Sequence, residues 1–176
     1  MAIKALEHNW WRQPLHKEEK TWITIALVWC LVITVFMPVW HFMADQVVST
    51  ESYKISGEQY DVLFDEFVDK YKVGEMEGIA VTEPPANSDV FMRASQFLWE
   101  PVIKLKVNQT YRIHLSSVDM NHGFSITPIN MNFQAVPGYD FVITLTPTTT
   151  GEYVIQCNEF CGIGHHTMTG KIIVEA

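Results

Sequence analysis

The sequence contains few cysteines and few basic residues. Three cysteines among 176 residues are too few for the disulfide framework of many small secreted domains. Twenty acidic residues outnumber 12 lysines and arginines, and the resulting net charge of -8 argues against a nucleic-acid-binding protein. The sequence also lacks a glycine-rich phosphate-binding loop, an internal repeat and low-complexity runs. Aromatic residues make up 12% of the chain, so a disordered protein is excluded and a hydrophobic core is expected.

One segment, residues 21–44, carries no Asp, Glu, Lys or Arg. As a helix rising 1.5 Å per residue it would span about 36 Å, which is enough to cross a bilayer. Trp22 and Trp40 lie near its two ends, where aromatic anchors are common. The segment is longer than the apolar region of a signal peptide, and no small-residue cleavage motif follows it cleanly. It therefore predicts one uncleaved transmembrane helix.

Basic residues flank this segment unequally. Four precede it and one follows within twenty residues: Lys4, Arg12, Lys17 and Lys20 before, and Lys54 after. The positive-inside rule therefore predicts a cytoplasmic segment at residues 1–20 and a part outside the membrane at residues 45–176. Cys30 lies within the apolar segment and is expected to act as a small buried hydrophobe. Cys157 and Cys161 remain as a pair in the outer part.

The outer part divides into a connector at 45–88 and a strand-rich region at 89–176. In the connector, Ser56 and Gln59 form a capping-box pattern, and apolar residues follow at helical spacing, so an amphipathic helix is expected with Gly74 as its stop. Pro84 and Pro85 mark the expected boundary. Beyond it, β-rich runs separated by turn signals predict a sandwich or small barrel with strands at 102–106, 111–115, 141–145, 153–156 and 171–174.

A group of metal-binding residue types lies near the C-terminus. Cys157, Cys161, His165 and Met168 follow the spacing C-x3-C-x3-H-x2-M, and His122 lies 35 residues before the first cysteine. Thiolate, imidazole and thioether together favour a soft transition metal, although two thiolates and two imidazoles also suit structural zinc. Two thiolates can instead bridge two copper ions, with one histidine for each metal and the Glu159 carbonyl as a further ligand. Such a centre would relay electrons.

These residues resemble those of subunit II of the haem–copper oxidases, over roughly residues 89–176. The likeness rests on S-x-D-M-x-H at 117–122 and on C-x-E-x-C-x3-H-x2-M at 157–168. The resemblance implies an all-β, cupredoxin-like Greek-key sandwich or barrel preceded by one N-terminal transmembrane helix. It implies a binuclear copper (CuA) centre with these ligands: His122, Cys157, Glu159 through its carbonyl, Cys161, His165 and Met168. Asp119 would orient a ligand or its loop.

The single predicted membrane helix resembles the B-type, ba3-like members of that family, which implies the cell membrane of a prokaryote. The E-K-x-W stretch at 19–22 is similar to one that lies in those proteins at the mouth of a proton path, which makes Glu19 a candidate for that role. The Glu159 side chain is a candidate for Mg²⁺ at the contact with subunit I. The helical segment at 54–76 has no counterpart in the family pattern.

The resemblance also implies partners. Subunit I would hold the haem and reduce oxygen, and cytochrome c or a similar carrier would donate electrons near Phe97 and Trp99, although Trp99 suits core packing as well. Residues 45–176 contain 17 acids and eight bases, a charge that would attract a basic donor. His166 is expected at the surface, and His114 is expected to point outward from its strand. The alternative function is a membrane-anchored protein that delivers or senses copper.

Overall fold

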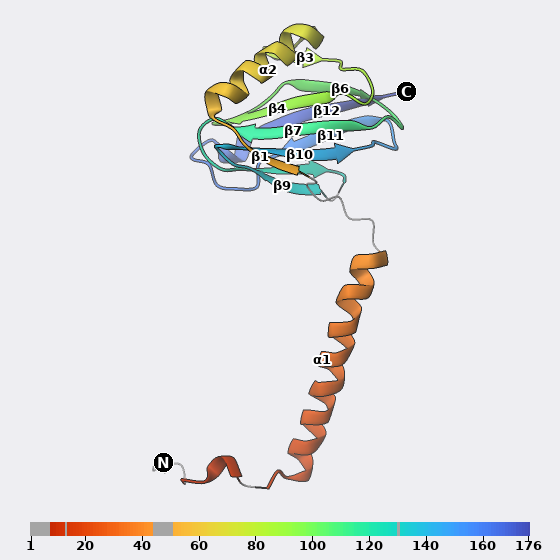
Figure 1. Ribbon diagram of the computed structural model, residues 1–176, viewed down its shortest axis with the longest axis vertical. Coiled ribbons are helices and arrows are strands. Elements are labelled where there is room, and N and C mark those ends of the chain that lie inside the picture. Colours follow the sequence, from red (N-terminus) through yellow and green to blue (C-terminus); the bar gives the residue numbers. More distant parts are fainter. Residues whose placement is uncertain (1–7, 13, 44–50, 130) are drawn as a thin grey trace. The chain divides into compact units, whose positions relative to one another are not determined.

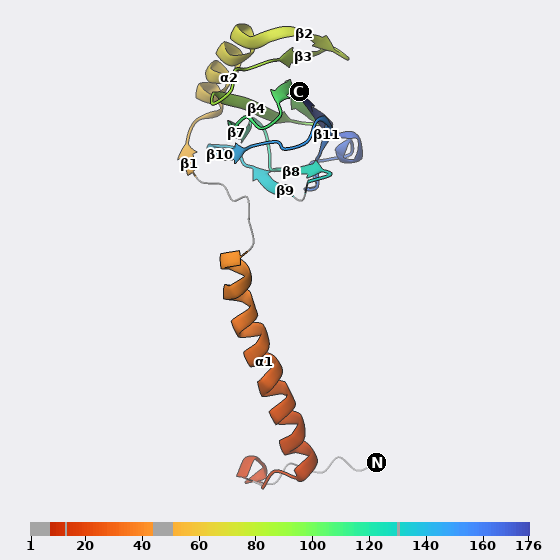
Figure 2. The same cartoon turned by 90° about the vertical axis from the view of Figure 1, so that its right-hand side faces the viewer.

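The computed structural model describes residues 8–12, 14–43, 51–129 and 131–176, and Figures 1 and 2 show it from two sides. The chain forms two compact units, Met1–Gln46 and Val47–Ala176. The first contains a short 3-10 turn at Trp10–Arg12 and the helix α1 at Lys17–Met43. With 27 residues and a mean hydropathy of 2.3, α1 is long and apolar enough to span a membrane. The expected apolar helix is therefore present.

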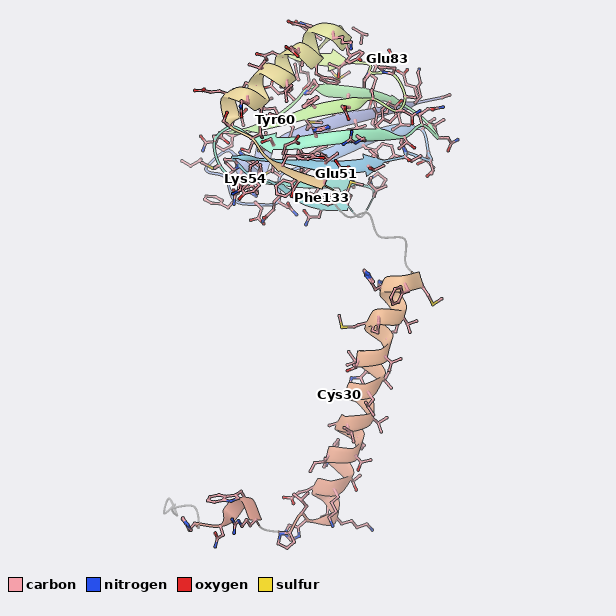
Figure 3. All side chains as sticks on the ribbon, in the orientation of Figure 1. Cys30, Glu51, Lys54, Tyr60, Glu83 and Phe133 are labelled. Atoms are coloured by element: carbon pink, nitrogen blue, oxygen red, sulfur yellow. The ribbon has the colours of Figure 1, made fainter. Side chains whose placement is uncertain are left out.

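Helix α1 begins four residues before the uncharged segment. Glu18 and Glu19 lie in its first turn, where negative charge interacts favourably with the helix dipole. The His16 backbone N–H donates to the Glu19 carboxylate at 2.8 Å, which satisfies one of the free amides at the helix start. Cys30 was expected to be a small buried hydrophobe, but within this chain it is exposed on α1 (Figure 3).

The second unit is a β-sandwich of two mixed sheets, which confirms the expected fold class. The first sheet has five strands in the order β1 (Glu51–Lys54), β10 (Tyr139–Leu145), β7 (Tyr111–Ser117), β4 (Asp89–Ser95) and β5 (Leu98–Glu100). The second sheet has seven, in the order β2 (Lys72–Met76), β3 (Ile79–Thr82), β6 (Val102–Lys106), β12 (Thr169–Glu175), β11 (Gly151–Gln156), β8 (His122–Thr127) and β9 (Met131–Ala135).

The core between the sheets is made by the alternating residues that the strand patterns predict. The five expected strands are present as β6, β7, β10, β11 and β12. Trp99, Phe124 and Ile155 are fully buried there, and Met131 is buried as well, whereas Met120 is 36% exposed. Most of the remaining strands have five residues or fewer, and β8 contains Gly123, so their period-two patterns are short or interrupted. Strand β4 alternates over seven residues without a glycine, and it was not among the expected strands although its pattern is clear.

The connector is part of the sandwich. Strand β1 pairs with β10 in the first sheet, and β3 pairs with β6 in the second, so the structural unit does not begin at the proline pair. Helix α2 (Gly57–Tyr71) has the predicted Ser56–Gln59 capping box. It ends at Tyr71 because the next five residues form β2, so the expected stop at Gly74 is wrong. Gly74 lies at a register shift between β2 and β3.

Helix α2 covers the outer face of the first sheet (Figure 2) with three buried aromatic side chains, Tyr60, Phe64 and Phe67. The Tyr60 hydroxyl, marked in Figure 3, lies 2.8 Å from the Met92 carbonyl and 2.9 Å from that of His114, so its single proton is shared between two neighbouring strands. Arg93 on β4 pairs with Asp61 of the helix at 2.8 Å and with Glu100 of β5 at 2.8 Å. Helix and sheet are therefore joined by apolar contact and by partly buried ion pairs.

This cover explains why His114 does not point into solvent. Its ring stacks on Phe91 at 4.5 Å, and its Nδ1 lies 2.6 Å from a carboxylate oxygen of Asp140. Burial is the largest single influence and opposes protonation, but the hydrogen bonds and negative charges of Asp140 and Asp89 together outweigh it and raise the pKa of His114. His114 does point outward from its strand, as expected, but it is buried, because helix α2 packs on that outer face of the sheet.

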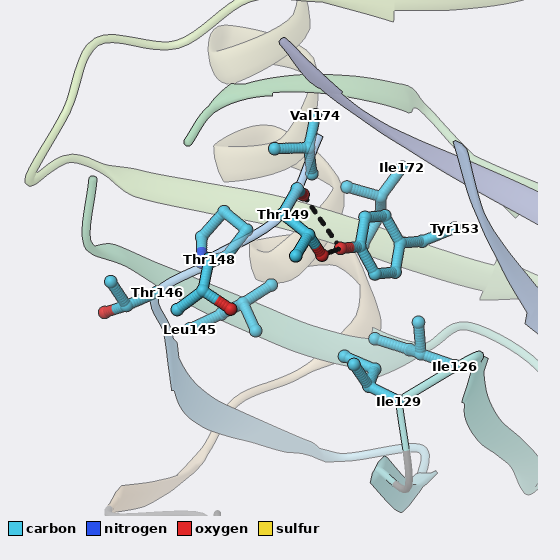
Figure 4. A pocket seen from close by; sticks show the side chains of 10 residues that line it. Ile126, Ile129, Leu145, Thr146, Thr148, Thr149, Tyr153, Ile172 and Val174 are labelled. Carbon is cyan, nitrogen blue, oxygen red and sulfur yellow. Dashed lines mark hydrogen bonds between the residues drawn. The ribbon is translucent and has the colours of Figure 1, made fainter. Parts of the chain in front are cut away.

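A small cavity of about 80 Å³ lies at the end of the sandwich where β11 begins (Figure 4). Ile126, Leu145 and Ile172 line its apolar wall, and the Tyr153 hydroxyl lies 2.8 Å from the Thr149 carbonyl at its mouth. None of the six expected metal ligands lines it. Those residues lie at the opposite end, beyond the last residue of β11.

Candidate metal centre

Two neighbouring strands of the second sheet bring the first ligand residues together. His122 is the first residue of β8, and Cys157 follows the last residue of β11; these strands pair antiparallel with Gln156 opposite Ser125. The chain after Cys157 passes so close to β8 that a Cβ atom on Gly123 would lie 1.7 Å from the Asn158 side-chain oxygen. Because Gly123 has no side chain, the backbone that follows Cys157 can pack directly against β8. The sequence contains this residue, but no motif marks it as part of the site.

The metal loop, residues 157–168, is closed at its base and tightly turned near its end. The Cys157 N–H donates to the Met168 carbonyl at 3.1 Å, next to the Gln156–Thr169 pair at which β11 ends and β12 begins. A short 3-10 helix spans His165–Thr167, and the Met168 N–H donates to the His165 carbonyl at 3.2 Å. In this geometry residues three apart share one side. The His165 and Met168 side chains therefore both face Cys161.

Each cysteine sulfur has two neighbouring atoms that could also bind a metal. The Cys157 sulfur lies 3.9 Å from His122 Nδ1 and 3.2 Å from the Glu159 carbonyl oxygen. The Cys161 sulfur lies 3.7 Å from His165 Nδ1 and 3.8 Å from the Met168 sulfur. The two cysteine sulfurs are 3.9 Å apart. All six residues expected from the sequence thus meet in one cluster, arranged as two halves around two thiols.

The donor set fits a soft metal. Two sulfurs bound to one metal at about 2.3 Å and at a tetrahedral angle would lie about 3.8 Å apart, and the observed separation is 3.9 Å. His122, Cys157, Cys161 and Met168 are buried, and the ligand atoms of the first three lie within 4.8 Å of one another. Burial, together with Cys157, raises the pKa of the Cys161 thiol to about 11. A metal cation would favour the thiolate and oppose this effect.

Asp119 orients one histidine of the cluster. Its carboxylate oxygen Oδ1 lies 2.8 Å from His122 Nε2, on the side of the ring away from Cys157. A carboxylate accepts the Nε2 proton, so Nδ1 keeps its lone pair for a metal. The same carboxylate also accepts from the Ser117 hydroxyl and from the backbone N–H of Met120. The position expected for Asp119 beside a ligand is thus observed.

The residues expected near the site for other reasons are placed differently. Trp99 is fully buried, with its ring 6.1 Å from that of His122, so it offers no surface for a docking partner. Phe97 is 37% exposed and packs on Gly162 and Gly164 of the metal loop. Glu159 is exposed, and its side chain accepts a hydrogen bond from Gln134 at 2.8 Å. His166 is exposed, as expected.

Two exposed apolar residues of the metal loop were not singled out from the sequence. Ile163 is 94% exposed, and Phe160 is 81% exposed with its ring 5.9 Å from that of His165. Large apolar side chains so exposed beside a buried cluster are typical of a surface that contacts another protein. The sequence did contain a signal for this surface: both residues lie between the cysteines and the histidine of the expected metal motif. Large apolar residues in so short a loop are not needed for core packing, so they indicate a contact surface.

Comparison with known proteins identifies the family. The family described as "Cytochrome C oxidase subunit II, periplasmic domain" matches residues 88–176, which include every residue of the cluster. The chain belongs to this family. Cytochrome c oxidase subunit 2 of Thermus thermophilus is 33% identical over 92 residues, which cover 52% of this chain and 68% of the relative. A second Thermus thermophilus protein of the same name has the same identity over 92 residues, and 55% of its length is covered.

Solved structures support both the fold and its combination with one apolar helix. A chain of a haem–copper terminal oxidase dimer is 26% identical, with a TM-score of 0.55, and the similarity covers 90% of this chain and 100% of that one. Rusticyanin, in its His143Met form, has a TM-score of 0.52 at 19% identity and covers 73% of this chain. Since this identity is low, rusticyanin shows the cupredoxin-like fold alone. The similarity to the oxidase chain is not confined to the sandwich, since 90% of this chain includes part of the first unit.

Proposed function

We propose that this chain binds a binuclear copper centre and accepts electrons for a haem–copper terminal oxidase. The proposed ligands are the two cysteine thiolates, two imidazoles, one thioether and one backbone carbonyl, supplied by Cys157, Cys161, His122, His165, Met168 and Glu159. One observation carries the proposal: two buried sulfurs lie 3.9 Å apart, and each faces its own histidine nitrogen. A mononuclear blue copper site uses one thiolate with both histidines, so the second cysteine and its separate imidazole favour two coppers.

The residues around the cluster suit electron relay rather than catalysis on a substrate. When bound, a copper pair shared by two thiolates spreads one unpaired electron over both metals and exchanges it with little change in bond lengths. The chain holds the donors in place through Asp119 at His122 and through the closed base of the metal loop. The burial of both sulfurs excludes water and leaves no route for a substrate. Oxygen reduction would take place in the haem-bearing subunit I.

The electron donor would be cytochrome c or a similar small carrier. Phe97 is 37% exposed and lies against two glycines of the metal loop. The acidic outer part would attract a basic carrier, with an association rate that falls as salt rises. Trp99 has no part in this docking because it is fully buried. Electrons would enter at Phe97 and leave towards haem in subunit I.

We further propose that α1 anchors the chain in a prokaryotic cell membrane, with its N-terminus in the cytoplasm and the copper-binding unit outside. The length and hydropathy of α1 support the span, and the flanking basic residues support the direction. Glu19 accepts a hydrogen bond at the helix start, and a role at the mouth of a proton path stays a prediction. Mg²⁺ binding by Glu159 also stays a prediction; subunit I would supply further ligands.

A protein that delivers or senses copper is less consistent with the cluster. Such a protein releases its metal, which requires accessible ligands. His122 and Met168 have no exposed surface, and the two cysteines are 3% and 1% exposed. Structural zinc is also disfavoured, because the sandwich has a large apolar core of its own and zinc gains little from a methionine ligand.

The test is to load the full chain with copper in detergent, count the metal and record an electron paramagnetic resonance (EPR) spectrum. We expect two coppers per chain and one unpaired electron coupled equally to both nuclei. One copper coupled to a single nucleus, or a preference for zinc over copper, would contradict the proposal. Reduction by a basic cytochrome c, slower at high salt, would then test the direction of electron transfer.

A further inference from the structure

A two-residue turn between β4 and β5 reaches both segments that carry the proposed ligands. It consists of Gln96 and Phe97, and it joins strands that pair with Ser95 opposite Leu98. Nothing in the oxidase-like motifs at 117–122 or 157–168 includes this turn. It nevertheless lies against the metal loop, because the Phe97 ring is in contact with Gly162 and Gly164.

Gln96 forms hydrogen bonds in two directions. Its backbone N–H donates to Asp119 Oδ2 at 2.6 Å, while Asp119 Oδ1 is 2.8 Å from the His122 ring. Its side-chain Nε2 donates to the carbonyl of Cys161 at 3.0 Å, and that carbonyl oxygen can only accept. The same nitrogen lies 3.6 Å from the sulfur of Met120. One residue thus bonds to the carboxylate that orients one histidine and to the backbone of a ligand cysteine.

The Phe97 backbone shows that the turn is held in this position by its surroundings. Phe97 has a φ of +72°, a left-handed conformation that favours glycine. A residue other than glycine keeps such a conformation where neighbouring structure imposes it. The ring lies over the metal loop so closely that a Cβ atom on Gly164 would be 2.6 Å from its Cγ. Packing of the ring on these glycines therefore fixes the turn, and with it the position of both the backbone N–H and the side chain of Gln96.

We infer that Gln96 is a positioning residue for the metal centre: it couples the Asp119–His122 segment to Cys161 and sets the spacing of the two ligand halves. This inference rests on the proposed copper centre and adds a residue to its support. An outer hydrogen bond of this kind affects a metal by fixing the orientation and separation of the ligands. Without the Gln96 amide, the Cys161 carbonyl loses its donor and the metal loop can shift relative to His122.

The test compares Gln96→Met with Gln109→Met in the full chain in detergent. Methionine keeps the length of the side chain and removes its donor, and Gln109 is an exposed glutamine in the turn between β6 and β7. For Gln96→Met we expect about tenfold weaker copper binding in competition with a chelator, together with unequal EPR coupling to the two coppers. The thermal midpoint of the metal-free variant should match that of Gln109→Met, because a local positioning role does not alter global stability.

A Gln96→Met protein with the copper affinity and EPR coupling of the wild type would overturn the inference. If that variant does not fold, Gln96→Glu replaces it, since this change keeps the backbone donor and sets a carboxylate against the Cys161 carbonyl. Wild-type spectra from Gln96→Glu would overturn the inference equally. The failure of the copper centre itself is distinguishable, because the wild-type chain would then not show two equally coupled coppers, and the role of Gln96 would fall with it.

Discussion

The α2-covered face of the first sheet and the metal loop of the second sheet both bury polar groups, but the two regions satisfy them differently. On the α2-covered face, His114 and Asp140 lie 2.6 Å apart, and Arg93 lies 2.8 Å from Asp61. These are direct, charge-assisted contacts within the protein. In the metal loop and at His122 beside it, each thiol lies 3.7–3.9 Å from an imidazole nitrogen and from the other thiol, too far for a strong hydrogen bond.

The difference separates a structural role from a binding role. Groups that contact each other directly stabilise the fold, and removing one partner leaves the other buried without compensation. Groups that converge at the spacing of ligands around a metal contribute little to the fold by themselves. We therefore expect changes in the metal loop to affect the metal and changes under α2 to affect stability, each with little effect on the other property.

The largest effect is expected from Cys161→Ser. The change removes the sulfur that lies close to the other thiol, a histidine and the methionine, so the two-copper signal should disappear. The metal-free chain should unfold at nearly the same urea concentration as the wild type. Copper counting with EPR and a urea titration measure the two properties. Cys30→Ser on α1 is the matched control and should keep both coppers; a normal two-copper spectrum from Cys161→Ser would refute the assignment.

Phe67→Ala should give the opposite result. Phe67 is 5% exposed and belongs to the hydrophobic core, so truncation should lower the free energy of unfolding by about 3–5 kcal/mol. Copper content and EPR coupling should be those of the wild type. Leu63→Ala, a change at a 39% exposed position of the same helix, serves as the control and should cost much less. Altered coupling in Phe67→Ala would show that the two regions are not independent.

A smaller loss of stability is expected from Tyr60→Phe. The change removes one hydroxyl that lies close to two backbone carbonyls on neighbouring strands and keeps the ring in place. We expect a loss of about 1–2 kcal/mol in a urea titration, with the spectrum of the copper centre unchanged. Tyr53→Phe, a change on the exposed edge strand β1, provides the comparison. Equal losses of unfolding free energy from the two changes would mean that burial between α2 and the sheet does not strengthen the hydrogen bonds of Tyr60.

The smallest effect concerns pH. Because the pKa of His114 is raised in the folded chain, its protonated form stabilises the fold at pH values below its unfolded pKa of about 6.5, and this contribution is lost as the pH rises through the raised value. Asp140 on β10 and Asp89 on β4 face the ring, and Arg112 pairs with Asp89 and with Glu51 of β1. In urea titrations at a series of pH values, His114→Gln should lack this decline.

Much of the site was predictable because its signals are local. The spacing C-x3-C-x3-H-x2-M places four side chains on one loop, and the capping box at Ser56 and Gln59 appears as expected. The strands of the connector were not predictable, since a run of only four or five residues forms a strand only when a neighbour is available to pair with it. This is why Gly74 lies in a strand pair and not at a helix end.

The sequence by itself determined the ligand types, their order and the apolar helix, because metal chemistry and bilayer thickness act on residue type and on short spacings. Tertiary structure alone decided which distant residues meet. It set His122 against Cys157, buried Trp99 and His114, and brought Gln96 to both ligand segments. The physical reason is that strand pairing and helix packing set these contacts over long separations, where a residue's neighbours in sequence carry no information about its neighbours in space.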